Sequence, residues 1–247
     1  NYQFVTNEDI TMTPQDGVYK FSNVNVYEGT LATYRYTVDS TDVDQKFTIP
    51  NNNADTSTLK VIIQNSISDT TQTVYTLASG LKGLTDTSKA YFLQETDLGK
   101  FEVYFGDGVI GNKLSDGNIV ILEYVVSNKE EANGASSFAL SGSIGGFTNA
   151  TITTNSVAQG GSEPETKESI RFNAPLQYTS QDRAVTTTDY ETLVKSIYPN
   201  VQSISAWGGE DDETPVYGVV KIAIKAKSGS TLTNTTNSSL YGVSNIN

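Results

Sequence analysis

Apolar residues recur at every second position along much of the first 155 residues of this 247-residue chain. Three stretches show the alternation most clearly, namely 34–38, 59–63 and 101–105. Patterns of period two that are rich in Tyr, Val, Ile and Thr are typical of half-buried strands. We therefore predict a strand over each stretch, with Ile62 as the one apolar residue that points to the second face of its strand.

The run from Ile119 to Val126 is different, because it is apolar at nearly every position and only Glu123 interrupts it. A strand that exposes neither face to water has this composition. The run therefore predicts a central strand that is covered on both faces.

The pattern changes near residue 159. Gly145, Gly146 and a Thr/Asn-rich segment at 148–155 lead to Gln159-Gly160-Gly161-Ser162, after which helical signals begin. We place a domain boundary here, with a β-rich domain over 1–158 and an α+β domain over 159–247. The Ser/Thr/Asn-rich tail has little apolar periodicity, so we expect the second domain to be truncated at its C-terminal end.

Two helices are predicted after this boundary. Pro164 lies among Glu163, Glu165 and Glu168, which is typical of a first helical turn, and Pro175 should end or kink that helix. The second helix has a predicted capping box of Thr188 and Glu191. Its apolar residues lie at i, i+3, i+4, i+7 and i+8 on one face, and Pro199-Asn200 should stop it: Tyr190, Leu193, Val194, Ile197 and Tyr198.

Two further strands are predicted, at 201–208 and 216–227. In the second, Val220, Ile222 and Ile224 share one face, and Lys221, Lys225 and Lys227 share the other. The predicted fold is therefore mainly β with a smaller α+β part: an antiparallel or mixed β domain followed by two helices and a β-hairpin.

Composition excludes several functions. The net charge is −12, which disfavours nucleic acid and anionic membrane surfaces because both need clustered Lys and Arg. No apolar run approaches the length of a membrane span, and no signal-peptide pattern opens the chain. The chain has no Cys and no His, so thiolate chemistry, disulfides, a Ser-His-Asp triad and His-based zinc sites are excluded. We predict no catalytic, cofactor-binding or metal site, and no small-molecule ligand.

The segment "FEVYFGDGVIGNKL" (101–114) contains G-x-G-x-x-G at Gly106, Gly108 and Gly111, the fingerprint of a dinucleotide-binding turn. That site requires a helix to begin at the third glycine, because the helix N-terminus binds the phosphates. The residues after Gly111 instead lead through the turn dipeptide Asp116-Gly117 to the strand at Ile119. We interpret the three glycines as positive-φ positions in a connection between two strands.

Acidic residues form two further groups, Glu210 to Glu213 and the trio Asp39, Asp42 and Asp44. Either group offers oxygen ligands to Ca²⁺, but neither has the ligand spacing of a known loop. We interpret the first as a solvated hairpin tip and the second as turn residues.

Three other features have open interpretations. Trp207, the only Trp, is either an interface anchor or a core residue. Arg183 either pairs with Asp189 or Glu191 or is solvated. Asn149, Asn234 and Asn237 begin N-x-S/T triplets, which chance explains in so Asn- and Thr-rich a sequence.

Two ordered signatures resemble a known family. The first is Phe105-Gly106-Asp107-Gly108 with Gly111 and Asp116-Gly117, before the apolar run that ends in "LEYVVSN". The second is "IRFNAPLQYTSQDRAVTTTDYETLVKSIYPNV" (170–201), which precedes the acidic-tipped hairpin "QSISAWGGEDDETPVYGVVKIAIKAKSG". Both resemble the baseplate J-like proteins of contractile phage tails, and the stretch 127–134 resembles the baseplate wedge type of T-even phages. The resemblance covers about residues 100–230.

The resemblance implies a structural role without catalysis. A protein of this family would join neighbouring subunits into the ring around the tail hub, and the ring would rearrange on contraction. The implied partners are other baseplate wedge and hub proteins and further copies of the same chain. The implied location is the virion tail baseplate, with assembly in the cytoplasm of the bacterial host. Residue 1 is Asn rather than Met, so we expect a piece of a longer chain.

Two alternatives remain at this point. A carbohydrate-binding or adhesin β domain of a virion would suit the Thr/Asn/Tyr-rich composition and would need exposed aromatic platforms. A carboxylate-dependent glycosidase would need two acids held about 5–10 Å apart. The Gly-rich stretch 142–161 is the predicted joint between the two parts of the chain.

Overall fold

The structure is a computed structural model that describes residues 1–14, 16–42, 44–181, 183–198 and 201–226. The chain divides into two compact units, Asn1–Asn128 and Lys129–Asn247. The boundary predicted at 158/159 lies inside the second unit and stays a prediction.

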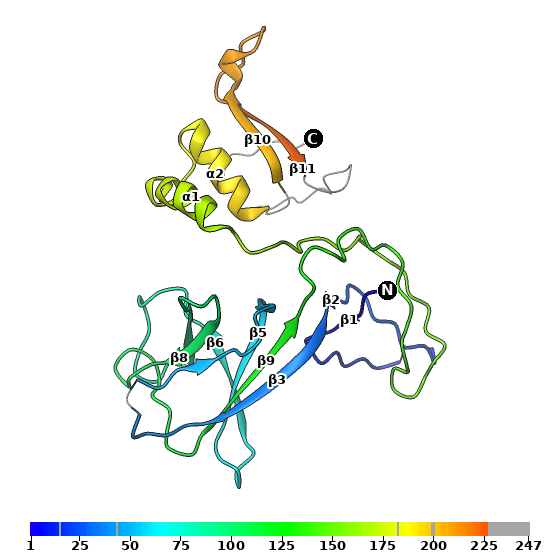
Figure 1. Ribbon diagram of the computed structural model, residues 1–247. Helices are drawn as coiled ribbons and strands as arrows, with labels where there is room; N and C mark the ends of the chain where they lie inside the picture. The colour runs from blue at the N-terminus through cyan, green and yellow to red at the C-terminus, as the bar shows by residue number, and fades with distance from the viewer. Residues whose placement is uncertain (15, 43, 182, 199–200, 227–247) are drawn as a thin grey trace. The chain divides into compact units, whose positions relative to one another are not determined.

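The first unit is built on a seven-stranded sheet (Figure 1). Its strands lie in the order β3-β9-β5-β6-β7-β8-β4, and all neighbours are antiparallel except β6 and β7. The strands are β3 (Thr30–Thr37), β4 (Phe47–Thr48), β5 (Ala54–Gln64), β6 (Gln72–Leu77), β7 (Ala90–Glu95), β8 (Phe101–Phe105) and β9 (Ile119–Val126). A separate pair consists of β1 (Phe4–Val5) and β2 (Tyr27–Glu28). The mainly β prediction is confirmed.

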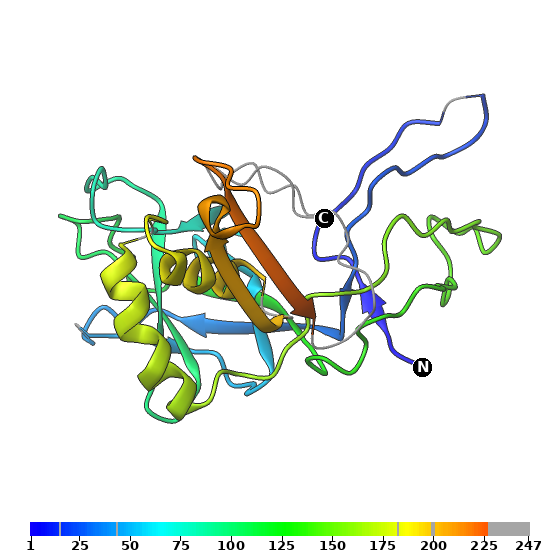
Figure 2. The same ribbon diagram turned by 90° about the horizontal axis from the view of Figure 1, so that it is seen from above.

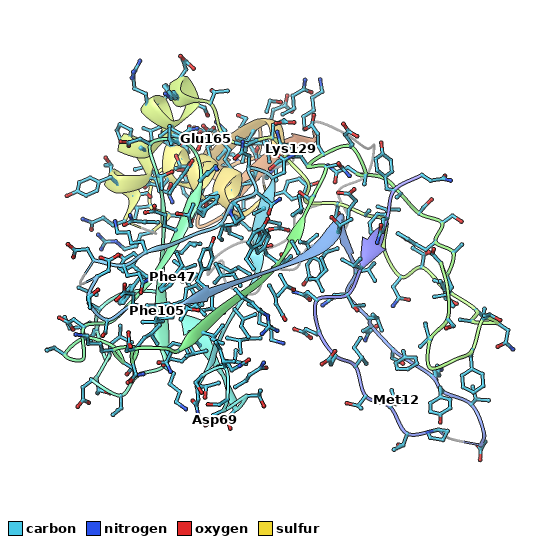
Figure 3. The ribbon with its side chains drawn as sticks, turned by 60° about the horizontal axis from the view of Figure 1, so that its bottom comes forward. Met12, Phe47, Asp69, Phe105, Lys129 and Glu165 are labelled. Carbon is cyan, nitrogen blue, oxygen red and sulfur yellow. The ribbon has the colours of Figure 1, made fainter. Side chains whose placement is uncertain are left out.

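The core of this unit draws side chains from both ends of the sheet. Phe105 on β8 packs edge-on against Phe47 on β4 and Tyr75 on β6, with ring centroids 5.8 and 5.5 Å apart. Figure 3 shows Phe47 and Phe105 side by side. The Tyr36 hydroxyl on β3 donates to the carbonyl oxygen of Thr48 on β4 at 2.6 Å. The sheet therefore curls until its first and last strands approach each other around one apolar core.

β9 lies between β3 and β5, as its nearly continuous apolar run predicts. Val120, Leu122 and Tyr124 belong to the main core. Ile119 and Ile121 point to the other face, where they form a second buried cluster with Ile62. Covering on both faces is thus confirmed, and so is the placement of Ile62 on the second face.

The second unit contains α1 (Lys167–Ser180), α2 (Thr187–Ile197), β10 (Val201–Gly208), the short 3-10 helix η1 (Gly209–Asp211) and β11 (Val220–Ala226). β10 and β11 form an antiparallel hairpin, α2 packs on β10, and α1 packs on α2. The bounds of β10 match the prediction. In β11, Val220, Ile222 and Ile224 are half-buried, whereas Lys221 and Lys225 are exposed, as the alternation predicts.

The predicted start of β11 at residue 216 is wrong. The Val216 N–H donates to the Gly209 carbonyl at 2.9 Å, and the Gly209 N–H donates to the Val219 carbonyl at 2.8 Å. Gly218 has φ = 77°. Residues 216–219 therefore belong to the connection between β10 and β11, and regular pairing resumes only at Val220.

α1 starts later than predicted, and of the two predicted effects of Pro175, an end or a kink, the end does not occur. Its N-cap is Thr166, whose hydroxyl accepts from the Ser169 N–H at 3.2 Å, so Pro164 lies before the helix and not in its first turn. Pro175 lies inside the helix and does not end it. The helix continues because proline removes only one hydrogen-bond donor, whereas later donors stay bonded, such as the N–H of Gln181 to the carbonyl of Gln177.

The capping box of α2 begins two residues before the predicted one. The N-cap is Thr186, whose side chain accepts from the Asp189 N–H, and the Asp189 carboxylate accepts from the Thr186 N–H at 2.8 Å. The predicted pair of Thr188 and Glu191 is wrong because Glu191 has another partner. Its carboxylate accepts from the backbone N–H of Ala206 on β10 at 3.0 Å.

Candidate interaction surfaces

The glycine-rich loop between β8 and β9 has the conformation expected of a strand connection. Gly108 and Gly111 have φ = 90° and 86°, which favour glycine, and the described loop contains no helix. Gly106 does not have a positive φ, and this part of the prediction is wrong. Gly106 is required for space instead, because a Cβ there would lie 2.3 Å from the carbonyl oxygen of Ile110.

The backbone N–H groups of this loop donate to the protein itself. One carboxylate oxygen of Asp107 accepts from Val109 and Ile110 at 2.9 and 3.0 Å. The Gly111 N–H donates to the carbonyl of Thr85 at 3.0 Å. The hydrogen bonds from Ile110, which contributes most, and from Val109 hold the pKa of Asp107 below its usual value. The groups that would bind a phosphate in a nucleotide site are therefore engaged by an internal carboxylate and a carbonyl.

In the acidic trio Asp39, Asp42 and Asp44, which follows β3, Asp39 and Asp42 accept hydrogen bonds from residues two positions further along the chain. Asp39 accepts from the N–H and the hydroxyl of Thr41 at 2.9 and 2.6 Å, which lowers its pKa. Asp42 accepts from the N–H of Asp44 at 3.2 Å. Among the described residues, no group of three or more acidic, His or Cys side chains is arranged to hold a metal ion.

The acidic hairpin tip is an ordered turn rather than a ligand cluster. Asp212 accepts from the indole N–H of Trp207 at 3.3 Å and pairs with Lys221 across the hairpin. Both contacts lower the pKa of Asp212, Lys221 contributing most. Trp207 is half-buried at the base of this turn. Its role in the free chain is therefore to fix the tip, and contact with a partner stays a prediction.

Arg183 does not pair with either predicted acid. Its guanidinium donates to the side-chain oxygen of Gln181 at 2.6 Å. Asp189 and Glu191 accept backbone N–H groups instead, as described above. Asn149 is exposed, whereas Asn234, Asn237 and Lys227 lie outside the described residues. None of the helices in the described ranges is long and apolar enough to cross a membrane.

Exposed apolar side chains occur at many places among the described residues, and four of these places are on a projecting arm, a sheet edge, a helix and a tight turn. The first is an arm of the first unit, defined as residues 6–14 and 16–26, in which Ile10, Met12 and Val18 are among the exposed residues. Figures 2 and 3 show this arm standing away from the sheet of its own unit, with Met12 far out on it. The second is the free edge of the sheet along β3, where Leu31 and Tyr34 are exposed.

The other two places belong to the second unit. One is α1, whose packed residues include the polar Ser169, Asn173 and Ser180, whereas Ile170 and Tyr178 are exposed. The arrangement is held by Glu165, which accepts from the Ser169 hydroxyl and the Asn173 amide. The packed face of α1 therefore combines these polar residues with Leu176, and it is less apolar than the packed face of a typical surface helix.

The last is a tight turn at 144–147. Ile144 and Phe147 exchange two backbone hydrogen bonds of 2.9 and 3.0 Å across Gly145 and Gly146. Both glycines have positive φ, and both apolar side chains are exposed. Periodicity could not indicate these four surfaces, because it shows which residues are apolar and not which of them the chain itself covers.

Part of the predicted joint at 142–161 is fixed to the unit that contains it. The Asn133 side chain donates to the Gly161 carbonyl at 2.7 Å and accepts from the Gly161 N–H at 3.1 Å. Gly134 and Ala135 bond to both backbone groups of Ala158, and Lys129 pairs with Glu163. Bending within the stretch would therefore be confined to residues 142–157, and a joint there stays a prediction.

Two comparisons relate the chain to known proteins. The sequence profile of a family described as "Baseplate structural protein gp6, C-terminal domain I" matches residues 186–242, which include α2, β10 and β11. The baseplate wedge protein gp6 of Enterobacteria phage T4 is 26% identical over 255 aligned residues, covering 94% of this chain. The chain spans 37% of the length of that relative. Both similarities support a structural protein of a phage baseplate, and the J-like assignment within that class stays a prediction.

Proposed function

We propose that the chain is part of a structural subunit in the baseplate wedge of a contractile phage tail. In this proposal it joins neighbouring subunits into the ring around the tail hub, and its contacts rearrange when the tail contracts. The observation that carries the proposal is the alignment with the T4 wedge protein, because it runs through both units of the chain.

The exposed apolar side chains of the chain support a role in binding other proteins. Exposed apolar side chains lie on projecting or unpaired elements of each unit: the arm 6–26 and the edge of β3 in one, α1 and the 144–147 turn in the other. Exposed apolar surface marks interaction sites in proteins where it is contiguous and large. The partners proposed are other wedge and hub proteins and further copies of the chain, assembled in the host cytoplasm and retained in the virion.

In this proposal the subunit takes part in a movement of the ring. A ring that changes shape needs some interfaces that are moderate in area and partly polar. In this proposal the chain acts by binding alone and catalyses no reaction.

The test is a reconstruction of purified tail particles before and after contraction, made with the full-length protein that contains this chain. We expect several copies around the tail axis in both states, with interfaces that include the exposed surfaces above. A protein recovered only free in the lysate, or one that hydrolyses a polysaccharide, would overturn the proposal. A matched particle preparation from a phage lacking the gene should contain no ring.

A further inference from the structure

β3 presents an unpaired row of backbone groups. It pairs with β9 through all eight of its residues, and among the described residues no strand is hydrogen-bonded to its other side. β1 contacts β3, and the Gly29 N–H, just before β3, donates to the Gln3 carbonyl at 2.9 Å. The Val38 N–H, just beyond β3, donates toward the β9 side, to the Asn118 carbonyl at 2.8 Å. Backbone direction alternates along an antiparallel strand. The N–H and C=O groups that point to the open side are therefore those of Leu31, Thr33, Arg35 and Thr37.

This edge lacks the usual protection against strand addition. Natural sheets protect a free edge with proline, a bulge, a short strand or several charges. β3 has eight residues in unbroken register, no proline and a single charged side chain, Arg35. An extended segment can add to such an edge through main-chain hydrogen bonds.

The arm contains a segment that could pair as a strand with the open edge of β3. Ile10 and Met12 alternate with Thr11 and Thr13, which is the pattern of a strand. All residues from 8 to 14 are exposed, and no hydrogen bond joins 6–14 to another described residue. Six residues at about 3.3 Å each span roughly 20 Å, which fits within an eight-residue edge.

We propose that residues 8–13 of one copy add as a strand to the free edge of β3 in a second copy. Charge favours this occupant, because the segment begins with the acidic pair Glu8-Asp9 and the edge has Arg35 as its one charge. Figure 3 shows Met12 standing away from β3 of its own chain, so the segment is presented outward. The inference rests on the proposed assembly role and names one of its contacts.

The contact is head-to-tail, since the donor and acceptor surfaces differ. Contacts of this type close into a ring when the rotation between copies is suitable and otherwise extend into a filament. Each copy would use its own edge and its own arm once.

The absence of Cys from the chain permits a direct test by cross-linking. Two variants of the full-length protein, Thr11→Cys and Thr33→Cys, with any cysteine outside these 247 residues replaced by serine, are mixed and oxidised. We expect a disulfide-linked dimer at a yield at least tenfold above that of a control mixture of Thr11→Cys and Ile67→Cys. Ile67 is a suitable control because it is 82% exposed and lies outside β3. Equal yields in the two mixtures would overturn the proposal.

A charge exchange tests the pairing independently. Arg35→Glu, or Glu8→Lys with Asp9→Lys, should weaken self-association at least tenfold in light-scattering titrations, and the three changes together should restore it. Lys82→Glu, an equal charge change at another exposed position of the unit, should leave association unchanged. Urea unfolding of each variant shows that its fold is retained. Failure of the triple variant to restore association, or a parent protein that stays monomeric at every concentration, would contradict the inference.

The two proposals can fail separately. A protein that enters tail particles but gives no Thr11–Thr33 cross-link retains the baseplate role and loses the arm contact. A protein that gives the cross-link in solution but is missing from purified tails retains the arm contact and loses the baseplate role.

Discussion

The hydroxyl of Thr58 accepts a hydrogen bond from the backbone N–H of Val125 at 2.9 Å and donates to the carbonyl of Asp55 at 2.7 Å. β5 and β9 pair Asp55 with Val125, but the register shifts before Lys60 pairs with Glu123. The irregularity would leave the Val125 N–H without a partner in the sheet. A buried side-chain hydroxyl thus completes the hydrogen bonding of β9, the strand at the centre of the first unit's core.

Thr58→Val should destabilise the protein. Valine has nearly the same shape but no acceptor, and Thr58 is only 2% exposed, so the Val125 N–H would be left buried and unpaired. We expect a loss of about 1–3 kcal/mol in the free energy of unfolding, measured with urea. Thr58→Ser keeps the hydroxyl and should lose only about 0.8 kcal/mol for the missing methyl. A valine variant as stable as the serine variant would contradict this account.

Gly106 and Gly108 in the loop between β8 and β9 should differ in their tolerance of alanine. Gly106→Ala places a Cβ 2.3 Å from a backbone carbonyl, and overpacking of this kind costs up to about 3 kcal/mol. Gly108→Ala meets no atom closer than 3.5 Å and should lose only about 1–2 kcal/mol, from its positive φ. Urea unfolding of both variants, beside Gly117→Ala as an uncrowded positive-φ control, tests the order. Equal losses at Gly106 and Gly108 would argue against the close approach.

Asp107 should make the stability of the loop pH-dependent. Its pKa is lowered in the folded state by the N–H groups of Ile110 and Val109. A lowered folded-state pKa contributes stability above the unfolded value of about 3.9 and loses it as the pH falls through the folded value. Asp107→Asn retains an acceptor but cannot titrate. We therefore expect its free energy of unfolding to fall less than that of the parent between pH 5 and pH 2.

The control for this comparison is Asp97→Asn, at an exposed aspartate to which no described residue donates a hydrogen bond. The pH profile of Asp97→Asn should resemble that of the parent more closely than that of Asp107→Asn. Parallel profiles for all three proteins would show that the hydrogen bonds to Asp107 are not maintained in solution.

The longer elements could be predicted because burial imposes a period on the sequence. β3, β5, β8 and β10 alternate, and β9 is apolar at every position except Glu123 because neither of its faces is exposed to water. β1, β2 and β4 contain two residues each, which is too short for any period to appear. The parallel pairing of β6 with β7 is a tertiary contact, and local sequence does not specify it.

The candidate surfaces could not be predicted for a different reason. Ile10 and Met12 have the same pattern as core residues such as Val61 and Ile63. Only the structure shows that the former are exposed and the latter buried. An apolar strand pattern indicates that a segment will be covered, and it does not say whether the cover comes from the same chain.

The local sequence of α2 is compatible with two different capping boxes. Thr186-x-x-Asp189 and Thr188-x-x-Glu191 both fit the signature, two residues apart. The tertiary contact decides between them, because Glu191 is oriented to accept from the Ala206 N–H on β10.

Thr186→Ala should therefore be the variant that removes the helix cap. We expect a loss of about 1 kcal/mol in the free energy of unfolding, because the Asp189 N–H loses its side-chain acceptor. Thr188→Ala is the matched control. Thr188 is exposed inside the first turn, where alanine is the better helix former, so its stability should be unchanged or slightly raised. Glu191→Gln should cost less than Glu191→Ala, since the amide oxygen can still accept from Ala206. If Thr188→Ala instead lost more free energy of unfolding than Thr186→Ala, Thr188 would be the N-cap and the observed geometry would be contradicted.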